Sequence, residues 1–415
     1  MRAAIIGGGA AGLFAACLLA REGVETLLLE KQPRVGRKLL STGNGRCNLS
    51  NLNASPADYH GDARHVRAAL EALPPRAAVA WFESIGLLCA PDEAGRVYPL
   101  SNQAAGVLDA LRLSAAEAGA RIETEFEVVK LLRRGKGFRI LAADGRSAEA
   151  DFVLAAPGGM AAPKLGGGPG GYRLLEELGH RIEPRLPAIA ALKTDPEAVR
   201  ALKGIRMHGE LTLLCGGRAQ RREAGEILFA ESGVSGIAAM QLAREVNLAM
   251  HRGQRCALRL NFLPGAPEDC IDRRARDLPQ RTMEDFLSGV VPRRLGQVLV
   301  KQAGVQPLSL RAEELRPDQR RAIRDALTGW TLDVRGTLGF DQAQVTCGGA
   351  ALSDFQPDTL ESRLAPGLFA AGEVLDVDGD CGGFNLQWAW ASAHLAAREI
   401  LRRCTGKTNF AGVQP

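Results

Sequence analysis

Residues 2–12, Arg-Ala-Ala-Ile-Ile-Gly-Gly-Gly-Ala-Ala-Gly, decide the fold of this chain. The short apolar run Arg2–Ile6 predicts a strand that leads directly into a glycine-rich loop. Residues 13–21 then predict a helix, and residues 25–30 predict a second apolar strand. The chain therefore opens with one strand–loop–helix–strand unit, which is the building block of a parallel α/β sheet.

The loop has the spacing Gly7-x-Gly9-x-x-Gly12. Gly7 permits the tight turn, Gly9 lets the backbone approach a pyrophosphate, and Gly12 lets the helix pack closely on the strand. The helix N-terminus, with Ala10 and Ala11 in its first turn, offers oriented N–H groups to phosphates. Because a strand precedes this spacing and a helix follows it, we predict a dinucleotide-binding loop.

Further acidic and glycine-rich segments indicate which dinucleotide is bound. Glu30 ends the second strand, where its carboxylate can accept a hydrogen bond from an adenosine ribose 2′-OH and would repel a 2′-phosphate. Gly372-Glu373 resembles the second FAD-contacting segment of two-dinucleotide-type flavoproteins, and Ala155–Gly159 resembles their Ala-Thr-Gly turn. Pro157 replaces the threonine of that turn, which removes a hydroxyl and a backbone donor. These residues favour FAD over NAD.

Composition fits a cytoplasmic globular protein of several structural units. The chain has 415 residues and 48 glycines, well above the roughly 7% glycine of average proteins. The nine cysteines form no C-x-x-C pair, so we expect reduced thiols in the cytoplasm. Residues 3–20 are uncharged, but their glycines fit a nucleotide-binding loop better than a membrane span, and we expect no membrane association.

The net charge of +5 is uneven, because residues 191–340 carry +6 and the rest of the chain carries −1. The arginines between residues 273 and 324 alternate with acidic residues, which is typical of a solvated helix face. No aromatic residues accompany them in a stacking pattern, so we do not expect a nucleic-acid partner. An RNA-modifying flavoprotein nevertheless stays open as an alternative.

The order of predicted elements gives an interrupted domain. A helix is expected over residues 103–118, a hairpin over 121–132 and 137–142, and a strand over 150–156. Alternating and then arginine-rich helical patterns follow, before an apolar strand at 367–371 and a helix at 382–401. We therefore predict an α/β fold, a doubly wound, Rossmann-like FAD-binding domain interrupted by a β-barrel-like plus helical insert. The expected boundaries are 1–189 and 341–415 for the FAD-binding domain and 190–340 for the insert, mainly β over 190–265 and mainly helical over 266–340.

Several motifs together resemble one bacterial flavoprotein family. They are Gly36-Arg37-Lys38, Ser41–Asn48, Arg96–Pro99, Gly225–Phe229, Gly372–Gly379 and Gly382–Trp390. This is the aminoacetone oxidase type, which also includes a reductase of unsaturated bile-acid intermediates, and the match runs from the first strand to the last helix. The resemblance implies a non-covalently bound FAD and an inserted β-barrel plus helical domain.

Fingerprint and resemblance together predict a set of site residues. The predicted cofactor-binding residues are Gly7, Gly9, Ala10, Ala11, Gly12, Glu30, Lys31, Arg37, Lys38, Ser41, Thr42, Gly43, Val128, Ala156, Gly158, Gly372, Glu373, Gly383, Asn385 and Leu386. Arg46 and Tyr98 are candidates for a catalytic role, and the Arg46–Asn48 loop either lines the substrate pocket or folds over the FAD. The six histidines form no metal-binding spacing, so no metal is expected.

These residues predict an FAD-dependent oxidoreductase that acts on a small organic molecule through N5 of the flavin. NAD(P)H is a candidate transient donor, since the sequence has no second dinucleotide fingerprint. Two enzymatic alternatives stay open: a reductase of an enone-like substrate, and an oxidase of a small primary amine that passes electrons to oxygen. The sequence does not indicate an oligomeric state.

Overall fold

The computed structural model describes residues 1–410, which form two compact units. One unit contains Met1–Arg185 and the segment that begins at Val345, and the other is Leu186–Gln344. The first unit is thus assembled from two separate stretches of chain, and the second is continuous.

The first unit is built on a five-stranded parallel sheet with strand order β20-β11-β1-β2-β7. Its register sets Ile6 beside Leu29 on one side and beside Ala155 on the other. The chain proceeds outward from β1 in both directions, which makes the sheet doubly wound and confirms the predicted fold class. The strands are β1 (Arg2–Ile6), β2 (Glu25–Leu29), β7 (Arg121–Glu123), β11 (Phe152–Ala155) and β20 (Leu368–Ala370).

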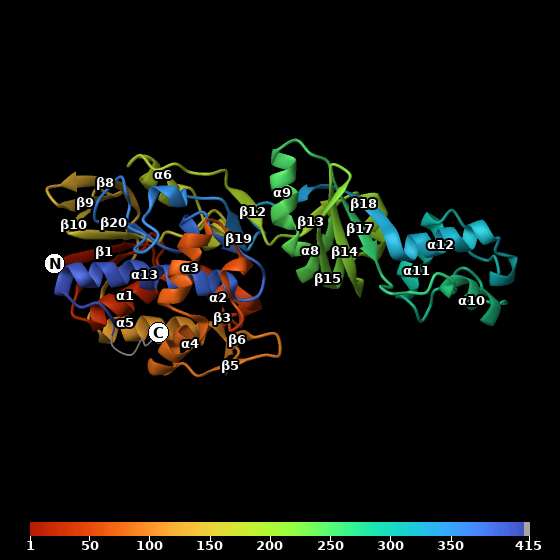
Figure 1. Ribbon diagram of the computed structural model, residues 1–415, viewed down its shortest axis with the longest axis horizontal. Coiled ribbons are helices and arrows are strands. Elements are labelled where there is room, and N and C mark those ends of the chain that lie inside the picture. Colours follow the sequence, from red (N-terminus) through yellow and green to blue (C-terminus); the bar gives the residue numbers. More distant parts are fainter. Residues whose placement is uncertain (411–415) are drawn as a thin grey trace. The chain divides into compact units, whose positions relative to one another are not determined.

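Helices α1, α5 and α13 cover one face of this sheet, and a small antiparallel sheet, β8 to β10, lies on the other (Figure 1). Ten of the twelve residues of α1 are buried, because the helix packs between the sheet, α5 and α13. Trp390 of α13 joins an aromatic cluster, with ring centroids 5.5 Å from Phe14 and 5.1 Å from Phe82. The helices of this unit are α1 (Ala10–Arg21), α2 (Arg37–Ser41), α3 (Ala63–Ala72), α4 (Pro75–Ser84), α5 (Ala104–Glu117), α6 (Gly170–Glu176) and α13 (Phe384–Thr405).

The hairpin expected at 121–132 and 137–142 is only half right. Residues 121–123 form β7, which pairs with β2 in the parallel sheet, and the antiparallel pairing starts at Val128. A break at residues 124–127 separates the two strands, because Glu125 and Phe126 hydrogen-bond to the backbone of Gln32 and Glu30. The strand expected at 150–156 is likewise divided between two sheets. The small sheet consists of β8 (Val128–Arg134), β9 (Gly137–Ala142) and β10 (Ser147–Ala150).

The shorter strands of the first unit lie in its loops. They are β3 (Ser50–Asn51), β4 (Tyr59–His60), β5 (Cys89–Pro91), β6 (Arg96–Pro99), β19 (Val345–Cys347) and β21 (Asp378–Gly379).

The second unit is a closed six-stranded barrel with a helical extension. Inward-facing residues alternate with outward-facing ones along β14, so Leu211, Leu213 and Cys215 are buried and the residues between them face outward. The last strand, β18, comes after the helices and closes the barrel by pairing with β13 and β17. The six barrel strands are β13 (Leu192–Thr194), β14 (Arg206–Cys215), β15 (Arg218–Ala230), β16 (Gly233–Ser235), β17 (Cys256–Asn261) and β18 (Trp330–Thr337). The short strand β12 (Leu186–Ala188) precedes the barrel and is not part of it. The helices are α7 (Pro196–Val199), α8 (Ile237–Gln241), α9 (Ala243–His251), α10 (Cys270–Asp277), α11 (Arg293–Gln302) and α12 (Pro317–Gly329).

Within residues 1–410, no helix combines the length and the apolar character needed to span a bilayer.

Candidate functional site

The candidate site lies at the carboxyl edge of the parallel sheet. Four strands end there, and each is followed by a predicted cofactor-binding segment. Gly7 follows β1, Glu30 follows β2, Ala156 follows β11, and Gly372 follows β20. Because parallel strands present their carboxyl ends at one edge, these four segments meet at the point where doubly wound sheets bind ligands.

The glycine loop is shaped by close backbone contacts. Gly7 has φ +106°, and a Cβ there would lie 2.3 Å from the Ala156 carbonyl oxygen. A Cβ on Gly12 would lie 1.9 Å from the Gly7 carbonyl oxygen, so only glycine lets α1 begin this close to β1. Gly9 differs from both, because a Cβ there would meet nothing within 4 Å. The open space is therefore at Gly9, where α1 presents its first-turn N–H groups.

Glu30 is buried and bound to two backbone N–H groups. Its Oε2 accepts a hydrogen bond from Gly8 N–H at 2.7 Å, and its Oε1 accepts one from Gln32 N–H at 2.8 Å. The carboxylate thus fixes the glycine loop to the end of β2. Two oxygens with about four lone-pair positions leave acceptor capacity for a ribose hydroxyl.

An ion pair joins two segments that are 335 residues apart in sequence. Lys38 Nζ lies 2.5 Å from Glu373 Oε2, and both side chains are less than one-third exposed. Glu373 Oε1 also accepts a hydrogen bond from Thr346 N–H at 3.0 Å. The Thr346 hydroxyl in turn accepts from Met160 N–H at 2.8 Å. This network fixes α2, β19 and the ends of β11 and β20 to one another.

Gly159 belongs to this network although sequence reasoning did not assign it to the site. A Cβ on Gly159 would lie 2.5 Å from both Glu373 Oε1 and Thr346 Oγ1. Thr346 was missed as well, because a single threonine between apolar residues has no distinctive spacing. The consecutive glycines at 158 and 159 were the one signal in the sequence that could have indicated a close approach.

The Arg46–Asn48 loop follows a left-handed turn. Gly43, Asn44 and Gly45 all have positive φ, as does Cys47. The Arg46 guanidinium lies over the Tyr98 ring, 4.7 Å from its centroid, so the two candidate catalytic residues are in contact. Burial raises the pKa of the Cys47 thiol to about 12, and at neutral pH the thiol is therefore protonated and a poor nucleophile.

Asn48 connects this loop to the start of α13. In the orientation that satisfies both ends of its amide, Asn48 accepts a hydrogen bond from Gly383 N–H and donates one to the Ser50 carbonyl, each at 3.1 Å. Gly383 has φ +96°, and a Cβ there would lie 2.4 Å from the Ser50 carbonyl oxygen. The N-terminus of the 22-residue helix α13 is thus held directly beside the loop that carries Arg46.

Asn385 has a partner that the sequence did not indicate. Its Oδ1 accepts from Gly379 N–H at 2.9 Å, and its Nδ2 donates to the Gly379 carbonyl at 2.7 Å. The Asn385 side chain therefore holds the 379–383 loop in place through the backbone of Gly379. Cofactor contact through Asn385 stays a prediction, as it does for half-buried Leu386 on the next position of α13.

The remaining predicted residues lie around the same edge. The hydroxyls of Ser41 and Thr42 donate to the carbonyls of Lys38 and Leu39 within α2. Val128 starts β8, two residues after Phe126, whose N–H bonds to the Glu30 carbonyl at 2.9 Å. Of three further predicted residues, Lys31 is exposed, Arg37 donates a hydrogen bond to the Gln32 side chain, and Gly158 has φ +76°.

The residues at this edge fit an FAD. The open face of Gly9 and the unpaired N–H groups of the first turn of α1 suit a pyrophosphate, and α1 has no acidic residue in that turn. Glu30 suits the ribose, and the uncharged N-terminus of α13 suits the electron-rich end of an isoalloxazine. Among the described residues, no group of three or more His, Cys, Asp or Glu side chains is placed to hold a metal ion.

Comparisons with known proteins agree with this geometry. The family described as "HI0933-like protein Rossmann domain" matches residues 1–399. A 3-dehydro-bile acid delta(4,6)-reductase of Clostridium scindens is 36% identical over 97% of this chain and 99% of its own length. A ribosomal RNA dihydrouridine synthase of Escherichia coli is 29% identical over 96% of this chain and 98% of its own.

Solved structures agree at the level of the fold. The crystal structure of 3-ketosteroid delta1-dehydrogenase from Sterolibacterium denitrificans aligns with a TM-score of 0.53 and 14% identity, covering 97% of this chain and 99% of that one. The glycine loop and the sheet order indicated a dinucleotide-binding Rossmann-type domain. The family match over nearly the whole chain and the 36% identical relative show the same. The chain belongs to the HI0933-like Rossmann-domain family, a family of FAD-dependent oxidoreductases.

Proposed function

We propose that this protein is an FAD-dependent reductase that saturates a carbon–carbon double bond conjugated to a carbonyl group. The observation that carries the proposal is the convergence of the Gly9 loop, Glu30 and Glu373 at the carboxyl edge of the sheet, next to the loop that carries Arg46. FAD held there supplies hydride chemistry when it is bound.

The names of two relatives support this substrate class through one shared reaction. The first relative is a delta(4,6)-reductase of a 3-dehydro bile acid, a name that describes ring double bonds conjugated to a carbonyl. The second makes dihydrouridine, which is uridine whose ring double bond next to a carbonyl has been saturated. Both reactions add hydrogen to a double bond that a carbonyl polarises.

Such a reaction needs a group that stabilises negative charge on the carbonyl oxygen. We assign this role to Arg46, because a guanidinium group is a cation with five N–H donors. Arg46 is exposed and has no ion-pair partner within residues 1–410, and the Tyr98 ring fixes the plane of its guanidinium. Its N–H groups are therefore available to donate hydrogen bonds to a substrate oxygen.

NAD(P)H is the proposed electron donor, and the test begins with it. The FAD-loaded protein is titrated without oxygen with NADH and NADPH, and the bleaching of the flavin is followed by absorbance. We expect one nucleotide to bleach it, a steroid dienone to restore the colour, and aminoacetone to leave the oxidised protein unchanged. Bleaching by aminoacetone with fast recovery in air would contradict the proposal and identify an amine oxidase.

Arg46→Gln provides the check on the assigned residue. We expect the donor to bleach the variant at the wild-type rate, while the dienone restores its colour about 100-fold more slowly, the loss seen when one charge-stabilising donor is removed. Arg64→Gln is the matched control, because Arg64 is also an exposed arginine and its ion-pair partner is Asp62. Equal rates for both variants would exclude Arg46 from the reaction.

A second candidate substrate is a uridine of RNA. It is favoured by two ribosomal RNA dihydrouridine synthases, from Escherichia coli and Haemophilus influenzae, which are each 29% identical over 96% of this chain. Liberation of dihydrouridine after incubation with ribosomal RNA, NADPH and the FAD-loaded protein is the test. Unmodified RNA together with an active dienone reductase would restrict the substrate to small molecules.

A further inference from the structure

Ion pairing divides the arginines of the second unit into two groups. In the helical part, Arg273, Arg293, Arg316, Arg320 and Arg324 pair with acidic side chains. Arg276, Arg294 and Arg321 of the same part are exposed and have no ion pair within residues 1–410. In β15, β17 and the turn before β17, four exposed arginines have no ion pair with any residue of 1–410. They are Arg218, Arg252, Arg255 and Arg259.

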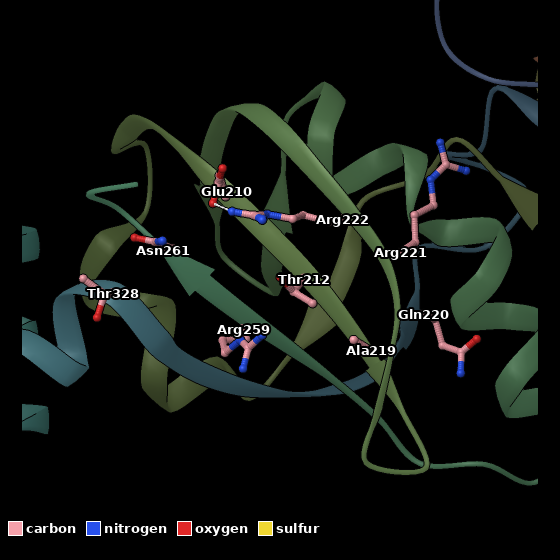
Figure 2. Close-up of a pocket in the computed structure, with 9 residues that line it drawn as sticks. All are labelled: Glu210, Thr212, Ala219, Gln220, Arg221, Arg222, Arg259, Asn261 and Thr328. Atoms are coloured by element: carbon pink, nitrogen blue, oxygen red, sulfur yellow. Dashed lines mark hydrogen bonds and ion pairs between the residues drawn. The ribbon is translucent and has the colours of Figure 1, made fainter. Parts of the chain in front are cut away.

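Arg259 faces outward on the barrel wall. The strand register sets Thr212 of β14 between Arg222 of β15 and Arg259 of β17, so all three point to the outer face (Figure 2). A hollow of about 450 Å³ opens over this row. Besides the row itself, its lining includes the polar residues Glu210, Gln220, Arg221, Asn261 and Thr328, and also Ala219.

The other three unpaired arginines lie where two connections meet at the end of the same strands. Gly216 N–H donates to the Arg255 carbonyl at 2.9 Å, which holds the β14–β15 hairpin tip beside the α9–β17 turn. Arg218 follows that tip, and Arg252 and Arg255 lie in that turn. We call Arg218, Arg222, Arg252, Arg255 and Arg259 the basic face.

Acidic side chains offset only part of this charge. Glu210 pairs with Arg222, as the dashed line in Figure 2 marks. Arg221 is oriented differently, since it pairs with Glu223 at 2.6 Å and with Glu245 of α9 at 3.2 Å. Asp333 of β18 lies opposite Ala257 and is the nearest remaining acid in the strand register.

The chemistry of the basic face selects an extended anion. Its arginines extend along β15 and β17 over several residues, which is more than one phosphate can contact. Apolar anchors are absent from it, since Ile237 is the one exposed large apolar side chain of the described second unit. The barrel aromatics Phe229, Phe262 and Trp330 are buried, so these rings offer no stacking platform for bases on this surface.

We propose that the basic face binds the phosphate backbone of single-stranded RNA without sequence preference. This inference rests on the RNA form of the proposed function, and it gives that function a docking surface outside the FAD site. Arginine guanidinium groups suit phosphate oxygens because they donate two parallel hydrogen bonds. The hydroxyl and amide groups of the hollow add neutral donors for phosphate or ribose.

The test measures binding of a fluorescent uridine 12-mer to the FAD-loaded, full-length protein by anisotropy at 50 and 200 mM salt. The variant is Arg218→Gln/Arg255→Gln/Arg259→Gln, which leaves out Arg252 because it caps α9. Three lost phosphate contacts lower the log–log salt slope by about 2 units, at roughly 0.7 per contact for single strands. The affinity of the wild type should therefore fall about 20-fold more than that of the variant between these salts.

The matched control is Arg276→Gln/Arg294→Gln/Arg321→Gln, which removes the same charge from exposed, unpaired arginines of the helical part. We expect it to bind like the wild type, and all three proteins to reduce a dienone equally. Equal affinity of the two triple variants, or binding to phosphatidylglycerol vesicles with none to the 12-mer, would overturn the inference. RNA that binds as expected but gains no dihydrouridine would instead refute the RNA form of the proposed function and leave the docking surface standing.

Discussion

Gly9→Ala separates cofactor binding from folding more sharply than any other change in the glycine loop. Gly9 has φ −84° and extended backbone, which alanine adopts freely, and an added Cβ would meet nothing within 4 Å. The protein without FAD should therefore unfold within about 1 kcal/mol of the wild type, the cost of alanine at a helix N-cap.

Binding of FAD should respond differently, because the added methyl group occupies the space through which a pyrophosphate approaches α1. Forcing a methylene into a filled site costs about 1–3 kcal/mol, which corresponds to a roughly 5- to 150-fold weaker FAD affinity. Flavin fluorescence quenching gives the affinity, and thermal unfolding of the FAD-free protein gives the stability.

Gly7→Ala is the contrasting variant. Gly7 has φ +106° and would place its Cβ 2.3 Å from the Ala156 carbonyl oxygen, so the FAD-free protein should lose about 2–5 kcal/mol of stability. If Gly9→Ala bound FAD with wild-type affinity, or destabilised the FAD-free protein as much as Gly7→Ala, the assignment of the open face of Gly9 to the cofactor would be wrong.

Three further predictions concern charge and burial. Lys38→Met should lower the free energy of unfolding by about 1–3 kcal/mol, because it leaves the partly buried Glu373 carboxylate without its cation; an unchanged melting temperature would refute this. The hydrogen bond from the His65 ring, aided by Arg64, holds the pKa of the Asp62 carboxyl well below its usual range, so its stabilisation is complete above about pH 4 and is lost as the pH falls further. Acid titration of Asp62→Asn, followed by circular dichroism, should show a shallower loss in that window, and a curve parallel to the wild type would count against it. Burial raises the thiol pKa of Cys17, Cys47 and Cys256 to about 12. These three cysteines should therefore resist a thiol reagent at pH 8 until denaturant is added. Labelling of the native protein within minutes, measured by mass spectrometry, would contradict this prediction.

The local parts of the fold could be predicted from the sequence, and the long-range parts could not. The glycine spacing of residues 7–12 predicted the strand before it and the helix after it, because that spacing depends on contacts within a few residues. Lys38 and Glu373 were both expected at the cofactor, yet their ion pair was not, because no pattern in the sequence reports a contact across 335 positions. The same limit applies to residues 121–132, whose apolar alternation suited one strand while two different sheets divide them.

In the candidate site, too, the sequence predicted which residues belong to the site but not which groups they contact. Cofactor contact through Asn385 stays a prediction, while the structure shows its amide bonded to the backbone of Gly379, a partner that only the folded loop provides. The basic face was also invisible in the sequence. Its arginines are spread from 218 to 259, whereas the helical part has a denser run of arginines, five of which pair with acidic side chains.

The split of the first unit sets an order of events on the ribosome. β11 is complete at Ala155, but its neighbour β20 begins only at Leu368, after the whole second unit has been made. At about 5–20 residues per second, the half-built sheet waits roughly 10–40 s with one edge unpaired. The inserted unit is continuous, and its barrel can close once β18 has been made at Thr337. From then until β20 is made, the nascent chain can carry a finished barrel attached to an unfinished nucleotide-binding sheet. A chaperone that shields the open edge of β11 would act in this interval, and the proposed FAD site would be complete only after Glu373 and α13 have emerged.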